Sequence, residues 1–105
     1  STSDVPVNSM TIVGDATIMN SANASHYEVA FDPATTTQNK VIWSLTGSSY
    51  ASLANTADGA CDIVLAEGAT GQTVTLTATN YYNNAVVATK TITIKVPIAK
   101  YKRVL

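Results

Sequence analysis

Lys40-Val41-Ile42-Trp43-Ser44-Leu45, in the middle of the chain, is an alternating run that contains the only tryptophan. Two similar runs flank it, residues 27–31 (YEVAF) before it and residues 73–78 (TVTLTA) after it. Successive side chains of a β-strand point to opposite faces, so each run predicts a strand with one buried face. Together the runs predict a small sandwich of two β-sheets with one large aromatic side chain, Trp43, in its centre.

Size and composition fit a single globular domain with few charges. The chain has 105 residues, which is the size of one domain. Charged residues make up 12% of it, about half the usual share, and the formal net charge is −1. Such a charge creates no strong field for nucleic acid or anionic lipid. The basic residues crowd the C-terminal end, which we interpret as a solvated strand end and linker: Lys95, Lys100, Lys102 and Arg103.

One feature favours an exported domain: a surface of hydroxyls and amides in place of ions is typical of extracellular β-domains. The single cysteine, Cys61, allows no intrachain disulfide, which does not argue for a cytosolic home, because an exported domain with a large core can lack disulfides. No apolar stretch approaches the length of a membrane span. The first four residues are polar and lack the apolar core of a signal peptide. We therefore expect a processed chain or, in preference, a fragment of a longer one.

The alternation predicts about seven or eight short antiparallel strands and no helix. The expected strands cover residues 5–13, 16–19, 25–32, 40–46, 50–54, 61–65, 72–81 and 85–96. In the first of them, Val7 is out of phase with Met10 and Ile12, which predicts a bulge or a change of sheet near Asn8 and Ser9. The first and last strands are expected to pair, with the chain ends at opposite poles.

Strand parity also predicts the core, since residues of one parity on each strand share the buried face. The predicted core residues are Tyr27, Val29, Phe31, Val41, Trp43, Leu45, Ile63, Val74, Leu76, Ile92 and Ile94.

Six segments, taken in order, resemble the bacterial immunoglobulin-like domain of group 2. They are residues 10–14 (MTIVG), 31–35 (FDPAT), 41–44 (VIWS), 50–53 (YASL), 58–59 (DG) and 71–79 (GQTVTLTAT). In that family a proline-containing loop precedes a V-T-W-S strand, and a glycine-led V-T-I-T-A-T strand and a terminal I-T-V strand follow. The similarity runs from about Val7 to Val96. It departs from the family pattern at Cys61 and Asp62 and in the loop before Gly71.

The resemblance implies an immunoglobulin-like β-sandwich over residues 1–97, with residues 98–105 as a linker or the start of a following module. Such domains occur in tandem on bacterial surface proteins, adhesins and some phage tail proteins, usually as spacers or stalks. It implies no catalytic residue, cofactor or metal. The expected partners are neighbouring domains of the same chain, with a glycan or a host surface protein as further possibilities, and the expected state is a monomer.

The inventory of reactive side chains is poor. His26 is the only histidine, and its parity opposite Tyr27 and Val29 predicts a solvent-facing position. A nucleophilic triad needs a base beside the nucleophile, so a solvent-facing His26 argues against one. Cys61 shares the parity of Ile63 and is expected to be a buried thiol that behaves as a small hydrophobe. We therefore expect no enzyme.

The carboxylates are too dispersed for the usual sites. Glu28 and Asp32 share one face of a strand, but four residues of extended chain separate them by roughly 13 Å, too far for a glycosidase pair. Asp58 and Asp62 flank a turn, yet Ca²⁺ requires six or more oxygen ligands and no dense acidic loop is present. One histidine and one cysteine do not make a zinc site.

Tyrosines near predicted turns are the remaining candidates for ligand contact. Tyr81 and Tyr82 lead into the Asn83-Asn84 turn, and Tyr50 follows the turn at Gly47. Exposed and coplanar, these three rings could stack on sugars or anchor a protein. The alternative is that one of the adjacent pair packs inward while the other covers a strand edge. A carbohydrate-binding module is thus the alternative to the spacer, adhesion or phage tail domain.

Overall fold

Eight β-strands form in the computed structural model, which describes residues 3–20, 24–67, 69 and 71–96. They are β1 (Ser9–Val13), β2 (Thr17–Met19), β3 (Ala24–Asp32), β4 (Val41–Thr46), β5 (Ala51–Ala54), β6 (Ala60–Leu65), β7 (Thr73–Asn80) and β8 (Val87–Lys95). Within the described ranges there is no helix able to cross a membrane. The prediction of an all-β chain is confirmed. The predicted linker, including Tyr101, lies outside the described residues.

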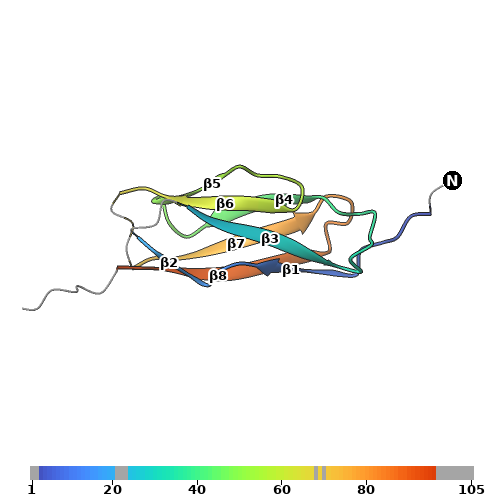
Figure 1. Ribbon diagram of the computed structural model, residues 1–105, viewed down its shortest axis with the longest axis horizontal. Coiled ribbons are helices and arrows are strands. Elements are labelled where there is room, and N and C mark those ends of the chain that lie inside the picture. The colour runs from blue at the N-terminus through green and yellow to red at the C-terminus, as the bar shows by residue number, and fades with distance from the viewer. Residues whose placement is uncertain (1–2, 21–23, 68, 70, 97–105) are drawn as a thin grey trace, which may run out of the picture.

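The strands form two four-stranded sheets that pack as a sandwich along the long axis of the molecule (Figure 1). The strand order is β1-β3-β6-β5 in one sheet and β2-β8-β7-β4 in the other. Every hydrogen-bonded pair is antiparallel except β2 with β8, which is parallel. The prediction of antiparallel strands throughout was wrong at this pair, because β2 runs beside the last strand in the same direction.

The chain changes sheet between β1 and β2, at Gly14 and Asp15. A Cβ atom on Gly14 would lie 2.6 Å from Cε1 of Tyr27, so glycine is the residue that fits against this ring. The Tyr27 hydroxyl donates a hydrogen bond to the Asp15 carbonyl at 2.6 Å. The predicted break of phase near Asn8 and Ser9 is present, since Val7 and Met10 are both buried and the two residues between them are exposed. The change of sheet offered as one explanation of it occurs later, after β1. The first and last strands, β1 and β8, lie side by side but belong to different sheets.

The first strand is shorter than predicted and begins at Ser9 instead of Val5. Before it, the chain is tied to the β3–β4 connection. The Val5 N–H donates to Thr37 Oγ1 and the Val7 N–H to Gln38 Oε1, both at 3.0 Å, while the buried Thr36 hydroxyl donates to the Val5 carbonyl at 2.6 Å. Because loop side chains take these backbone groups, the segment does not join a strand ladder.

The core lies between the sheets, and Tyr27 is fully buried in it. Most of the residues expected in the core by parity are buried, while Val29, Phe31 and Leu45 are partly buried and pack against the rest. Trp43 is buried with 9% of its surface exposed, but it does not occupy the centre. It sits on β4, at the edge of its sheet, beneath the turn that joins β5 to β6. Tyr27, on the inner strand β3, is more completely buried than Trp43, to which the sequence assigned the central position.

Candidate functional site

The three candidate tyrosines are exposed but do not form one cluster. Tyr50, Tyr81 and Tyr82 are 42%, 56% and 55% exposed. The Tyr81 N–H donates to the Lys40 carbonyl, just before β4, whereas Tyr50 follows the far end of that strand. Six residues of strand extend about 20 Å, so Tyr50 lies at the opposite end of the sandwich from the other two.

The Tyr81 and Tyr82 rings meet edge to face. Their centroids are 5.2 Å apart and their planes are inclined by 88°, while Lys40 Nζ lies 4.5 Å from the centroid of the Tyr81 ring. Tyr82 also borders a hollow of about 220 Å³ with Asp4, Thr37 and Gln38. A platform for a sugar ring needs coplanar aromatic faces, and these two rings do not supply one.

Asn80 fixes the turn that carries the tyrosines. Its side chain is buried, with Oδ1 accepting from the Tyr82 and Asn83 N–H groups at 2.9 and 3.1 Å and Nδ2 donating to the Gln38 carbonyl at 2.8 Å. One amide thus joins the β7–β8 turn to the β3–β4 connection. We did not identify Asn80 from the sequence, although the parity of Val74, Leu76 and Ala78 on β7 would have placed it inside.

His26 lies on the outer face of the first sheet, between two carboxylates. Its Nδ1 is 2.7 Å from Oδ1 of Asp62 on the neighbouring β6, and its Nε2 is 3.1 Å from Oε2 of Glu28. The hydrogen bond with Asp62, and then that with Glu28, raises the pKa of His26 above its ordinary value. With both ring nitrogens directed at acids, the imidazolium is favoured, and this form has no lone pair to act as a base.

Asp62 is held by this arrangement as well. The Asn55 side-chain amide donates to Oδ2 at 2.9 Å, and His26 contacts Oδ1; these hydrogen bonds lower the pKa of Asp62. Asp58, the other acid considered for Ca²⁺, lies elsewhere, beside Trp43. In the parts of the chain with described structure, no group of three histidine, cysteine or acidic residues is arranged to hold a metal ion.

The Cys61 thiol is completely buried and faces Tyr27 across the β3–β6 pair. Burial, with a smaller effect of the nearby Asp62 charge, raises its pKa to about 11. Since the thiolate is the reactive form, Cys61 has the setting of a structural residue.

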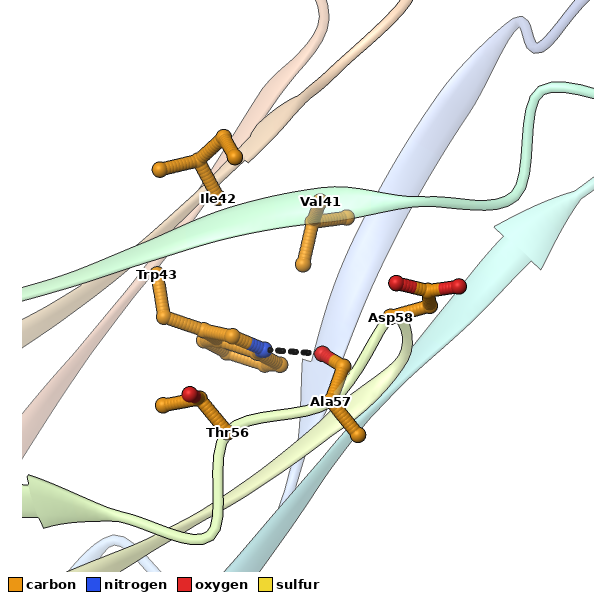
Figure 2. A pocket seen from close by; sticks show the side chains of 6 residues that line it. All are labelled: Val41, Ile42, Trp43, Thr56, Ala57 and Asp58. Carbon is orange, nitrogen blue, oxygen red and sulfur yellow. Dashed lines mark hydrogen bonds between the residues drawn. The ribbon is translucent and has the colours of Figure 1, made fainter.

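A hollow of about 270 Å³ opens beside the indole of Trp43. Figure 2 shows the ring lying between β4 and the β5–β6 turn, with its Nε1 donating to the Ala57 carbonyl at 3.0 Å and the Asp58 carboxylate nearby. Val41 and Thr56 complete the wall around the ring. The alternation of residues gave no sign of this hollow, because it indicates which face a side chain takes and not how completely a distant turn covers that side chain.

In comparisons with known proteins, no protein-family model matches this sequence and no curated protein matches it. The resemblance to the bacterial immunoglobulin-like domain of group 2 therefore stays a prediction.

Proposed function

We propose that this chain is a non-catalytic immunoglobulin-like module that acts as a spacer or adhesion domain of a bacterial surface or secreted protein. Its strand order supports this, since β1-β3-β6-β5 and β8-β7-β4 correspond to the ABED and GFC sheets of immunoglobulin-like sandwiches. In that correspondence β2 is a second part of the first strand that has moved to the other sheet.

The observation that carries the proposal is the placement of the two ends. Near the N-terminus, Val5 lies beside the β3–β4 connection, and the chain leaves the end of β8 at the opposite pole (Figure 1). A pull between these ends loads the parallel β2–β8 pair along its strands, so that its hydrogen bonds are strained together. At the two ends of this pair, the Thr93 N–H donates to the Ala16 carbonyl at 2.9 Å and the Asn20 N–H donates to the Lys95 carbonyl at 2.8 Å.

The surroundings of the two most reactive side chains, His26 and Cys61, support a non-catalytic role. Both ring nitrogens of His26 contact carboxylates on an exposed face, and Cys61 is buried with a raised pKa.

A phage tail domain would use the same load-bearing geometry. The carbohydrate-binding alternative is less well supported, because the Tyr81 and Tyr82 rings are perpendicular and Tyr50 lies at the far pole.

Single-molecule stretching between the two chain ends tests the mechanical role. We expect one cooperative unfolding event, and the substitution Asn20→Pro should lower its force because it removes the N–H that bonds to Lys95. Asn20→Ala keeps that N–H and serves as the matched control. An unfolding force that is the same in the Asn20→Pro variant and its control would contradict the proposed load path.

A glycan array separates the spacer from the sugar-binding alternative. We expect no reproducible binding. A glycan retained by the wild-type protein and lost in Tyr82→Ala would overturn the spacer assignment in favour of the carbohydrate-binding module.

A further inference from the structure

The outer edge of β4 is an open strand edge. The Tyr81 N–H donates to the Lys40 carbonyl, so from Lys40 onward the even-numbered residues of β4 direct their backbone N–H and C=O groups towards β7. The Val41 N–H points away from β7 and donates to the Asp58 carbonyl. By the same alternation, the N–H and C=O groups of Trp43 and Leu45 point outward. Among the residues that the structure describes, these backbone groups have no hydrogen-bond partner.

The other sheet edges are protected in ways that β4 is not. β2 has three residues and β5 has four. β2 covers only the C-terminal part of β8. The earlier part of β8 carries Lys90, which is half-buried and points to the same inner face as Ala88 and Ile92. β1 also lies alongside β8. Short edges and inward-pointing charges prevent strand addition. β4 has six residues with no proline, glycine or charge, and its Ile42 side chain is 53% exposed.

The hollow beside Trp43 lies along this same edge. A strand added to β4 would direct alternate side chains to the inner side, where the indole, Val41 and Ala57 offer an apolar wall. The carboxylate of Asp58 lies at the Val41 end of the hollow, and within the described ranges it forms no ion pair. The edge therefore combines unpaired backbone groups, an apolar recess and one free negative charge.

We propose that the β4 edge binds an extended segment of another polypeptide, which adds to the β2-β8-β7-β4 sheet as an antiparallel strand. The bound segment places small apolar side chains in the hollow beside Trp43 and a lysine or arginine next to Asp58. Backbone hydrogen bonds hold the strand and the recess selects its side chains, as in other complexes formed by strand addition. This binding surface is independent of the load-bearing role proposed above.

Amide hydrogen exchange measured by NMR tests the edge directly. In the free protein, the Trp43 and Leu45 amides should exchange at least about tenfold faster than those of Ile42 and Ser44, which face β7. The probe is a seven-residue peptide of alternating threonine and valine that ends in lysine. At saturation it should slow exchange at Trp43 and Leu45 by about tenfold or more. Unchanged exchange at both amides with millimolar peptide would overturn the proposal.

N-methylated peptides provide a matched control for the backbone contact. In an antiparallel pair, the residues that bond to Trp43 and Leu45 have their side chains on the same inner face, so they are the valines. Methylation of the valine amides should abolish binding, and methylation of the threonine amides should preserve it. Binding that survives methylation of the valine amides contradicts strand addition in this geometry.

The charge and the choice of occupant are tested separately. Asp58→Asn should weaken peptide binding about two- to fivefold at low salt, the effect of one exposed ion pair, while Asp32→Asn on β3 leaves it unchanged. Equal effects of the two variants would remove the role of Asp58.

If the Trp43 and Leu45 amides become protected without peptide as protein concentration rises, and the mass doubles, the occupant is a second copy and the proposed basic segment is wrong.

Discussion

Tyr27 and Trp43 are large aromatic residues on the inner faces of their strands, yet the two sides of the sandwich treat them differently. The Tyr27 side is closed, because the chain crosses from β1 to β2 over the ring and Gly14 touches it. On the Trp43 side, only the β5–β6 turn covers the indole, and a hollow remains. Each ring donates one hydrogen bond to a backbone carbonyl, of Asp15 and Ala57 respectively. The difference shows that coverage, and not parity, decides how deeply a core aromatic is buried.

The largest effect should come from Tyr27→Ala. Truncation of this fully buried ring leaves a cavity that the surrounding sheets cannot fill, and we expect a loss of about 4–5 kcal/mol of unfolding free energy. Urea denaturation followed by circular dichroism measures it. Tyr82→Ala, on an exposed ring, is the control and should change stability by less than about 0.5 kcal/mol. Similar losses in both variants would mean that Tyr27 is not the centre of the core.

Trp43→Ala should cost less, about 3 kcal/mol, at the low end for a large aromatic, because the β5–β6 turn can settle into the space. The same denaturation experiment measures the difference from Tyr27→Ala. In the wild-type protein, tryptophan emission should be blue-shifted and poorly quenched by iodide, since 9% of the residue is exposed. A red-shifted, readily quenched emission, or a variant that melts like the wild type, would remove Trp43 from the core.

Gly14→Ala tests the closure of the Tyr27 side. The added methyl group overlaps the Tyr27 ring, so we expect a loss of about 2 kcal/mol by overpacking. At Gly59 an added Cβ meets its nearest neighbour, Cε2 of Phe31, at 3.7 Å, and Gly59→Ala is the matched control. In the Tyr27→Ala background the cost of Gly14→Ala should fall, and the part that remains comes from the backbone, because the added Cβ also lies 3.0 Å from the His26 carbonyl and the φ of Gly14 is +158°. An unchanged cost there would show that contact with the Tyr27 ring contributes nothing.

The smallest effect concerns the outer face of β3 and β6, away from both aromatics. The raised pKa of His26 gives stability that is complete below its ordinary value of 6.5 and is lost as the pH rises through the folded-state pKa. The lowered pKa of Asp62 gives stability that is present above its ordinary value of 3.8 and is lost as the pH falls through the folded-state pKa. Stabilisation by the pair is therefore greatest between these two values.

Thermal melts of the wild type and His26→Gln across this pH range measure that contribution, and the difference in Tm should shrink as the pH rises above the His26 pKa. An NMR titration of the imidazole gives the pKa itself. A value at or below that of a free imidazole would show that the contacts with Asp62 and Glu28 do not persist in solution.

Strand existence and inward faces followed from the sequence, because alternation is a local property of extended chain. Residues 73–79 show this best: threonines and apolar residues alternate, and β7 covers them together with Asn80. The misplaced start of β1 has a different origin. Val5 and Val7 look like strand residues, but their N–H groups bond to Thr37 and Gln38, more than thirty positions away. No local pattern reports such partners.

The candidate tyrosines illustrate the same limit. Their neighbouring turns indicated exposure, and all three are exposed. Their mutual arrangement depends on the length of β4 and on the side-chain amide of Asn80, which orients the Tyr82 turn. Ring planes and distances of this kind arise only when separate strands are assembled, so a coplanar platform could be suggested but not tested from the sequence.

The amino-acid sequence by itself determined that the chain is all-β, which positions alternate inward, and that its reactive side chains are few. The tertiary structure decided where the chain changes sheet, that β2 runs parallel to β8, which aromatic is more deeply buried, and which edge stays open. The physical reason is the separation along the sequence of the residues that each property depends on. Side-chain alternation depends on neighbouring residues, whereas strand partners, ring coverage and unpaired edge groups depend on contacts between segments far apart in the chain.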